Sequence, residues 1–497
     1  MNKASQENDK GNEYFKARKF EESIVSFSNA ITVCDADQQL LSIFFSNRAL
    51  ANLKLKRYFS AIDDATQSFL LDKKYCKPLY YRYMARKALG ELNEAFIDIT
   101  AVCFLENEEI EKHVNARDEL MYELVAKKTE EFIRNLPRIS VKANDDIVEE
   151  YFKHFKMHAL FDQSYNAEKL NLFLQNLAIA PKVENRDAKI YLTKAIICFL
   201  NADWILAEKF ANEAIRHVKN DVKLKITAMI TLANTRMFPE NRMQFTSISN
   251  ILKIFDDALL LDKDNVDIYL HRAICYFLFK LYDQGFSDSQ RCVVMDPTFE
   301  EASILMFNAR YYMNVGKNPK AVKKMFTHFE EYVRDHPNSV DAPIEYSKLL
   351  YHSGETGKAV DVISKALEHN PANCLLLKEM AEYLAIQDPP TSRPFLLKAL
   401  NSGSLFKSEV FLLLAFVAAH QGDFNEALIY SNKAISLIRN ERSFLRGICR
   451  KEIVSSTVLA CNLLGLNTSI ANGFTFIKQL APVKAKIYSF RQSMFSE

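Results

Sequence analysis

The sequence predicts an all-α protein built from a tandem helical repeat, and two observations carry this prediction. The 497 residues include only 11 glycines and 13 prolines, whereas sandwiches and barrels need many turns marked by these residues. The second observation is periodicity: Ala61 and Ala95 are 34 residues apart, and so are Pro337 and Pro371. This period is typical of the tetratricopeptide repeat (TPR), a helix-turn-helix unit whose small residues let its two helices cross closely.

Degenerate copies of the unit occur along most of the chain. The segments 58–75, 282–297, 356–371 and 424–438 each combine a bulky or turn residue with a small residue three positions later and another seven positions beyond. A single repeat cannot bury its apolar stripe alone, so neighbouring repeats stack into a superhelix whose concave face is lined by the first helix of each unit. We therefore expect a TPR superhelix with a binding groove.

The chain is too long for one hydrophobic core, and we expect two repeat segments. Clear repeats end near residue 108, a charged amphipathic helix follows, and the polar stretch 136–146 is the expected boundary. The predicted organisation is an N-terminal clamp-type TPR domain over 1–108, a charged helical connector and linker over 109–146, and a C-terminal TPR-type array over 147–497.

Composition argues against several functional classes. Lys plus Arg number 64 and Asp plus Glu 62, and this net charge of +2 gives no reason to expect a nucleic acid as partner. The nine cysteines are scattered, which favours small buried residues in a reducing compartment over a metal site. We expect no transmembrane helix, because the longest apolar run, 410–419, is half the length that a spanning helix needs.

Catalytic and metal-binding motifs are also missing from the sequence. His154 and His158 are four residues apart, but no Glu follows the first as a zinc protease requires, so we expect a packing or surface role for both. The sequence contains no glycine-rich phosphate loop and no nucleophile elbow. We therefore expect a binding protein rather than an enzyme, with no cofactor and no metal.

Several segments together resemble one family. The stretches 10–24 (KGNEYFKARKFEESI), 46–55 (SNRALANLKL) and 98–106 (DITAVCFLE) resemble the clamp-type TPR domain of the mitochondrial outer-membrane import receptor, the seventy-kilodalton TPR subunit of the TOM complex. The stretch 147–155 (IVEEYFKHF) resembles the start of the receptor's second domain, and 265–278 (NVDIYLHRAICYFL) resembles a repeat of its C-terminal array. The similarity covers nearly the whole chain.

This resemblance implies a function and partners. Members of the family capture precursor proteins in a C-terminal groove, and their N-terminal clamp binds the acidic tails of seventy- and ninety-kilodalton heat-shock chaperones. The implied partners are thus mitochondrial precursors, other TOM subunits and, more weakly, those chaperones. The implied location is the cytosolic face of the outer membrane. Because the sequence begins at the first repeat without the family's N-terminal anchor, a cytoplasmic protein is the alternative.

The family's clamp pattern is only partly present. It places a Lys and an Asn four residues apart on the first helix, an Asn on the third, and a Lys and an Arg four apart on the fifth. Asn12, Asn47 and Lys77 match three of these positions. These residue types suit the task, since a clamp must neutralise two carboxylates at the end of a peptide.

Two expected cations are replaced. Asn8 stands where the pattern has Lys and Tyr81 where it has Arg, while Arg82 is the adjacent cation. One residue along a helix turns a side chain by about 100°, so Arg82 reaches inward only if the helix start is shifted. Losing both cations weakens binding of an acidic tail roughly ten- to several-hundred-fold. The candidate clamp residues are Asn8, Asn12, Asn47, Lys77 and Arg82.

The concave positions of the C-terminal array are apolar. If the small packing residue of a first helix is counted as the eighth, its fifth, ninth and twelfth residues face the concave side. We expect these residues to form a client groove for an apolar or amphipathic segment, although a tightly wound superhelix would bury them as core instead. His271 is added from the resemblance. The candidate client-groove residues are Leu270, His271, Ile274, Phe277, Leu412 and Phe416.

Two functions follow from these expectations. The first is a mitochondrial preprotein import receptor, or a receptor-like adaptor, that binds precursors in the C-terminal groove and chaperones at the N-terminal clamp. The alternative is a soluble TPR co-chaperone or scaffold without fixed attachment to an organelle.

Overall fold

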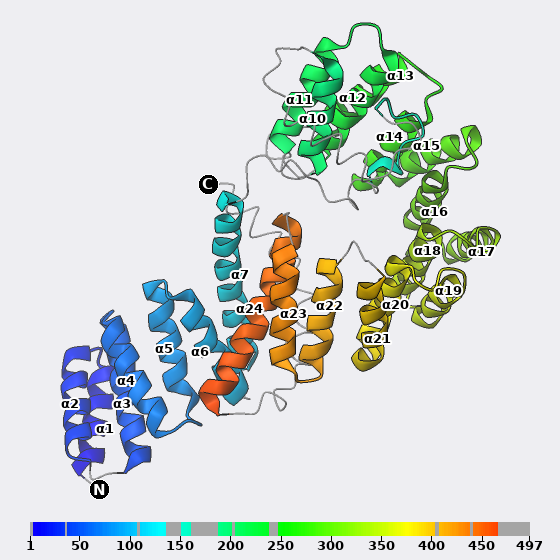
Figure 1. Cartoon of the computed structure of the whole chain (residues 1–497). Coiled ribbons are helices and arrows are strands. Elements are labelled where there is room, and N and C mark those ends of the chain that lie inside the picture. The colour runs from blue at the N-terminus through cyan, green and yellow to red at the C-terminus, as the bar shows by residue number, and fades with distance from the viewer. Residues whose placement is uncertain are drawn as a thin grey trace. The chain divides into compact units, whose positions relative to one another are not determined.

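The fold is all-helical, as predicted: within the part of the chain described by the computed structural model, no residue lies in a β-strand (Figure 1). The expected linker 136–146 lies outside this part. The described residues are 3–34, 37–106, 110–135, 151–160, 187–200, 204–237, 247–402, 407–437 and 441–465.

The helices group into two compact units. Unit 1 combines residues 1–136 with 408–497, and unit 2 comprises residues 137–407. The last helices of the chain therefore group with the first ones, and the domain boundaries expected from the sequence stay a prediction.

Unit 1 begins with three helix pairs and a long seventh helix. Its helices are α1 (Lys3–Lys16), α2 (Phe20–Thr32), α3 (Gln38–Lys54), α4 (Tyr58–Leu71), α5 (Cys76–Leu89), α6 (Leu92–Leu105), α7 (Ile110–Asn135), α22 (Lys407–His420), α23 (Phe424–Leu437) and α24 (Glu441–Leu464).

Unit 2 continues the same pairing. Its helices are α10 (Ala188–Leu200), α11 (Trp204–His217), α12 (Val222–Arg236), α13 (Ile248–Leu259), α14 (Val266–Leu278), α15 (Tyr282–Met295), α16 (Glu300–Asn314), α17 (Pro319–Asp335), α18 (Asp341–His352), α19 (Thr356–His369), α20 (Cys374–Gln387) and α21 (Pro389–Asn401).

Small residues are buried where the two helices of a repeat cross. Ser347 on α18 and Ala359 on α19 have no exposed surface, and the same is true of Ala415 on α22 and Ala427 on α23. Each pair lies on helices that are consecutive in the chain: α18 packs against α19, and residues of α22 and α23 share an apolar cluster and a stacked pair of rings, Phe411 and Tyr430. Short side chains at the crossing allow the two backbones to approach closely, which is the physical reason for the periodic small residues in the sequence.

The first repeat shows how tight this crossing is. The Ser23 hydroxyl on α2 donates a hydrogen bond to the Gly11 carbonyl on α1 at 2.9 Å. A Cβ atom added at Gly11 would lie 2.6 Å from Cδ1 of Phe27, whose ring is buried. Glycine is therefore required here by close packing and not by backbone conformation.

Helix α7 packs into the core of unit 1. Leu120, Met121 and Leu124 are almost fully buried in a cluster with residues of α5 and α6. Ile453 of α24 belongs to the same cluster, and α24 packs against both α6 and α7. The amphipathic pattern of this charged helix thus reflects a packed apolar side.

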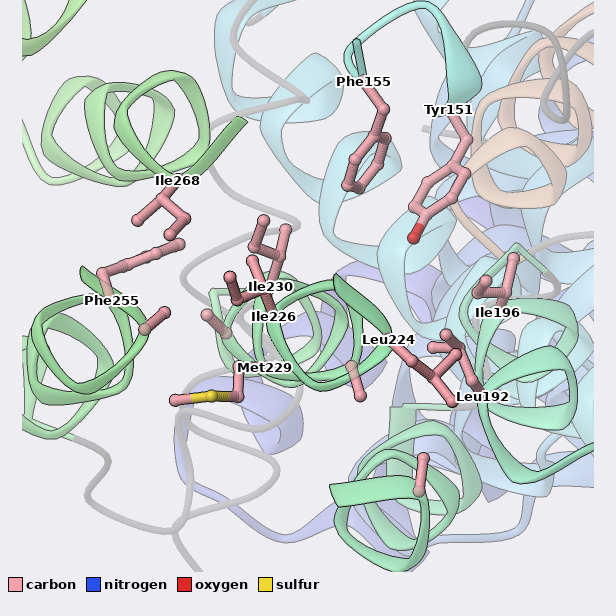
Figure 2. Packing of buried hydrophobic residues seen from close by; sticks show 14 of the residues in the cluster. Tyr151, Phe155, Leu192, Ile196, Leu224, Ile226, Met229, Ile230, Phe255 and Ile268 are labelled. Carbon is pink, nitrogen blue, oxygen red and sulfur yellow. The ribbon is translucent and has the colours of Figure 1, made fainter. Parts of the chain in front are cut away.

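The core of unit 2 is completed by a short segment, residues 151–160, outside the repeat helices. The rings of Tyr151 and Phe155 point from this segment toward α12, the helix that carries Ile226 and Ile230 (Figure 2). The Tyr151 hydroxyl lies 3.2 Å from that of Thr231 on α12. The segment is therefore held by buried aromatic packing as well as by hydrogen bonds.

None of the helices in the described ranges is both long and apolar enough to cross a membrane.

The packing at Gly11 gives a stability prediction. Gly11→Ala should lower the free energy of unfolding by about 1–3 kcal/mol, because the new methyl group must displace the buried Phe27 ring. Gly357→Ala on α19 is the control, since an added Cβ meets nothing within 4 Å there and should cost nothing. Thermal melting followed by circular dichroism compares the two. An unchanged melting temperature for Gly11→Ala would contradict the described packing.

Candidate functional site

The first candidate site is a polar face of unit 1 formed by α1, α3 and α5. The Asn47 side-chain NH2 donates a hydrogen bond to Oδ1 of Asn8 at 2.9 Å, which joins α3 to α1. Asn8, Asn12 and Asn47 are all partly exposed. Two of the candidate clamp residues therefore lie side by side, and they present amide groups without charge.

Helix α5 adds one cation and one phenol to this region. Lys77 is exposed, and Tyr81 is half-buried one turn later. Burial raises the pKa of Tyr81 to about 12, with smaller contributions from neighbouring tyrosines and Cys76, so its hydroxyl stays neutral. Tyr81 can donate a hydrogen bond, but it cannot replace the charge of an arginine.

Arg82 has a different position from the one the clamp requires. Its guanidinium is buried and holds both carboxylate oxygens of Asp98 on α6, at 3.0 and 2.7 Å. It also donates to the Thr66 hydroxyl on α4 at 3.1 Å. These bonds connect three consecutive helices, so the guanidinium of Arg82 serves the packing of the repeats.

The same tie recurs with the repeat. Arg48 holds both oxygens of Asp64 at 3.0 and 2.7 Å, and Arg272 holds those of Asp288 at 2.7 and 2.9 Å. In each case the arginine precedes its aspartate by 16 residues. Arg82 follows Arg48 by one repeat period. Bidentate pairs of this kind fix geometry as well as adding energy, so these arginines set the spacing of successive helices.

The second candidate site is a cavity of about 460 Å³ in unit 2. It is lined by α14, α16, α18 and α20, the first helices of four successive repeats, and by Lys153 and His154 of the segment 151–160. Its volume is in the range of ligand-binding pockets. The apolar side chains that line it are Leu270, Ile274, Ile304, Leu305, Ile344 and Leu375.

Charged side chains complete the wall of this cavity. Lys153 lies 3.2 Å from Asp341, and Lys348 lies 2.7 Å from Glu345. Asn308 donates to the other oxygen of Glu345 at 3.2 Å. The lining thus combines apolar surface with paired charges, and it is less purely apolar than the sequence pattern predicted.

Two carboxyl groups in the cavity are desolvated. Burial raises the pKa of Glu301 to about 7, with its backbone hydrogen bond and the Lys153 ammonium acting in the opposite direction. Burial also raises the pKa of Glu379, with a further contribution from Glu382. The Oδ1 atom of Asn308 is buried without a hydrogen-bond partner among the described residues. The cavity therefore offers acceptors whose interactions a bound cation or N–H group would improve.

The remaining client-groove candidates lie elsewhere. His271 is buried away from the cavity lining, with its ring against Phe155 at 4.4 Å, and burial holds its pKa well below the usual value. Phe277 packs against aromatic rings of α15 and α16. Leu412 and Phe416 belong to α22 of unit 1 and do not line this cavity. Leu270 and Ile274 are the candidates that the structure brings to it.

The sequence contained a signal for the residues that were missed. When Ser347 is counted as the eighth residue of α18, the fifth and ninth are Ile344 and Lys348, and both line the cavity. The register of α16 is harder to recognise in the sequence, because a large residue, Phe307, takes the place of the small residue at the helix crossing. The Phe307 ring stacks on Phe329 at 4.3 Å. The same numbering applied to every repeat would have found this part of the site.

Comparisons with known proteins agree with this architecture. No protein-family model matches the chain. The mitochondrial import receptor subunit TOM70 of mouse is 25% identical over 481 residues, covering 89% of this chain and 77% of the receptor. The chain is a relative of TOM70. The human receptor is 24% identical over the same span.

The solved structures extend the relation to the fold. The crystal structure of yeast Tom70 superposes with a TM-score of 0.51 at 20% identity, covering 91% of this chain and 95% of that one. Human serine/threonine-protein phosphatase 5 is 35% identical over 102 residues, or 20% of this chain. Relatedness to TOM70 thus spans both repeat segments, and the stronger local identity to the phosphatase is confined to a part with the length of a TPR domain.

Among the described residues, no group of three or more His, Cys, Asp or Glu side chains is arranged to hold a metal ion.

The tie at Arg82 gives a second prediction. Arg82→Ala should lower the free energy of unfolding by about 2–3 kcal/mol, because it removes one of the two arginines that pair with the fully buried Asp98 carboxylate and leaves only Arg86. Arg57→Ala is the matched control: its pair with Glu21 has the same 2.7 Å length but is exposed, and its loss should cost at most about 1 kcal/mol. Urea unfolding measures both. Equal effects of the two substitutions would show that the buried Arg82 pair contributes no more to the free energy of unfolding than an exposed pair does.

Proposed function

We propose that the chain is a mitochondrial protein import receptor, and that it binds segments of precursor proteins in the cavity of unit 2. The observation that carries this proposal is the cavity itself, in which four successive repeats converge on one apolar surface. The relation to TOM70 over 89% of the chain supports the same role. The work is binding, which requires no catalytic step or cofactor.

The chemistry of the cavity suits an unfolded or helical segment of a precursor. Such a segment presents apolar side chains that bury well against Ile274, Ile304 and Ile344. Polar groups at fixed places around an apolar floor orient a ligand and add specificity. The implied location is the cytosolic face of the outer membrane, where precursors arrive, with other subunits of the import complex as neighbours.

A second role belongs to the polar face of unit 1. We assign to it weak binding of the acidic tail of a chaperone, with Asn12, Asn47 and Lys77 as the main contacts and Asn8 as a supporting amide. The hydrogen bond between Asn47 and Asn8 favours this arrangement because it holds both amides on one face. A soluble co-chaperone or scaffold with the same two binding surfaces is the alternative to an organelle-bound receptor.

The client site is tested by a pair of neighbouring substitutions. Ile274→Asp should weaken binding of an unfolded precursor by at least about tenfold with little change in melting, because Ile274 lines the cavity and is only partly buried. Leu270→Asp should instead lower the melting temperature strongly, since Leu270 is fully buried beside Phe299. Pull-down and thermal melting on the same proteins measure both effects.

Val294→Asp on α15 is the control for this experiment, because Val294 is 77% exposed and does not line the cavity. It should change neither property. Unaltered precursor binding by a stably folded Ile274→Asp protein would rule out this cavity as the client site.

The chaperone site is tested by restoring charge. Asn8→Lys combined with Tyr81→Arg should strengthen binding of a peptide ending in Glu-Glu-Val-Asp at least tenfold, because each new cation pairs with a carboxylate. Lys77→Ala should weaken binding by the native chain. Fluorescence anisotropy with a labelled peptide measures both changes. Tight native binding that is insensitive to Lys77→Ala would place the tail elsewhere.

A further inference from the structure

The lining of the client cavity includes acidic side chains that lie beside a cation of the same chain. Asp341 on α18 and Glu301 on α16 both line the cavity, and Lys153 lines it as well. The Lys153 ammonium lies 3.2 Å from Asp341 and acts electrostatically on Glu301. A lysine thus stands where two neighbouring repeats present carboxylates beside an apolar surface.

Lys153 does not come from a repeat helix. It belongs to the segment 151–160, whose backbone is fixed by contacts that do not involve the Lys153 side chain. The Asp267 carboxylate accepts the backbone N–H groups of Lys156 and Met157 at 2.7 and 2.8 Å. Tyr151 and Phe155, which precede and follow Lys153 in the sequence, enter the core of unit 2 (Figure 2). The Lys153 side chain can therefore leave Asp341 while the segment stays in place.

The contact between Lys153 and Asp341 is weak enough to be exchanged. Both side chains remain partly exposed, at 26% and 35%. Ion pairs with this exposure change an equilibrium by at most about fivefold. A ligand that carries a cation can also bury apolar side chains against Ile274 and Ile304, and these additional contacts favour the exchange.

We propose that Lys153 is a tethered competitor, whose ammonium occupies an acidic subsite formed by Asp341 and Glu301 until a lysine or arginine of the client displaces it. The inference rests on the proposed function, since it names the client as an apolar segment with a basic side chain at one end. Lys153 then makes the cavity selective for basic segments. A neutral apolar segment leaves the ion pair between Lys153 and Asp341 in place, whereas a basic segment replaces the Lys153 ammonium.

The test uses the full chain and two synthetic amphipathic leucine-rich peptides that differ at one position, lysine in one and norleucine in the other. Lys153→Met removes the charge and keeps the length of the side chain. It should raise affinity for the lysine peptide about two- to fivefold, by the amount that such an ion pair contributes. Affinity for the norleucine peptide should not rise.

Lys156→Met is the matched control. It makes the same change in the same segment, but the Lys156 ammonium lies 3.7 Å from Asp296, which does not line the cavity. It should leave both affinities unchanged. Asp341→Asn with Glu301→Gln should abolish the preference for lysine over norleucine. Thermal melting of each variant verifies that it is folded, and Lys153→Gln repeats the main test with a second neutral side chain.

The outcomes separate this inference from the function on which it rests. If the native chain and Lys153→Met bind both peptides equally, the acidic subsite is refuted and the apolar client site stands. Weaker binding of the lysine peptide by Lys153→Met also refutes the competitor. If neither peptide binds to either protein, the proposed client site fails, and the tethered competitor fails with it.

Discussion

The close crossing of paired helices at small side chains determines how all the repeats of this protein are built. At Gly11 the space is so limited that a single methyl group would overlap the Phe27 ring. Such contacts fix how each first helix sits on its second helix, and stacking then repeats the arrangement. The face of each first helix that is turned away from its partner becomes available for a ligand.

Arginine–aspartate pairs fix how successive helices pack against one another. Arg48, Arg82 and Arg272 each reach a carboxylate 16 residues ahead and a polar side chain on the preceding helix, so one residue holds three helices. With the helices held in this way, the character of each concave surface depends on the few residues that face it. Unit 1 presents amides and a lysine, whereas unit 2 presents apolar side chains among paired charges. One architecture thus yields two surfaces of different chemistry.

The sequence predicted the fold because the 34-residue period and the scarcity of glycine record local packing directly. The register around Ala273 placed Leu270 and Ile274 on the concave side, and both residues line the cavity that we propose as the client site. Arg82 could not be assigned from a clamp pattern alone, because its role depends on Asp98, a partner on another helix. Lys153 was beyond sequence reasoning for the same reason: its contact with Asp341 spans 188 residues and no repeat pattern encodes it.

The proposed function requires that precursor segments bind in the cavity formed by α14, α16, α18 and α20. Site-specific photo-crosslinking can detect this binding. A photoreactive side chain is placed at Leu305 or Leu375 in the cavity, or at the exposed Leu260 or Val294 outside it. The account predicts cross-links to an unfolded mitochondrial precursor from the two cavity positions and none from the two outer ones. Cross-links from the outer positions alone would contradict it.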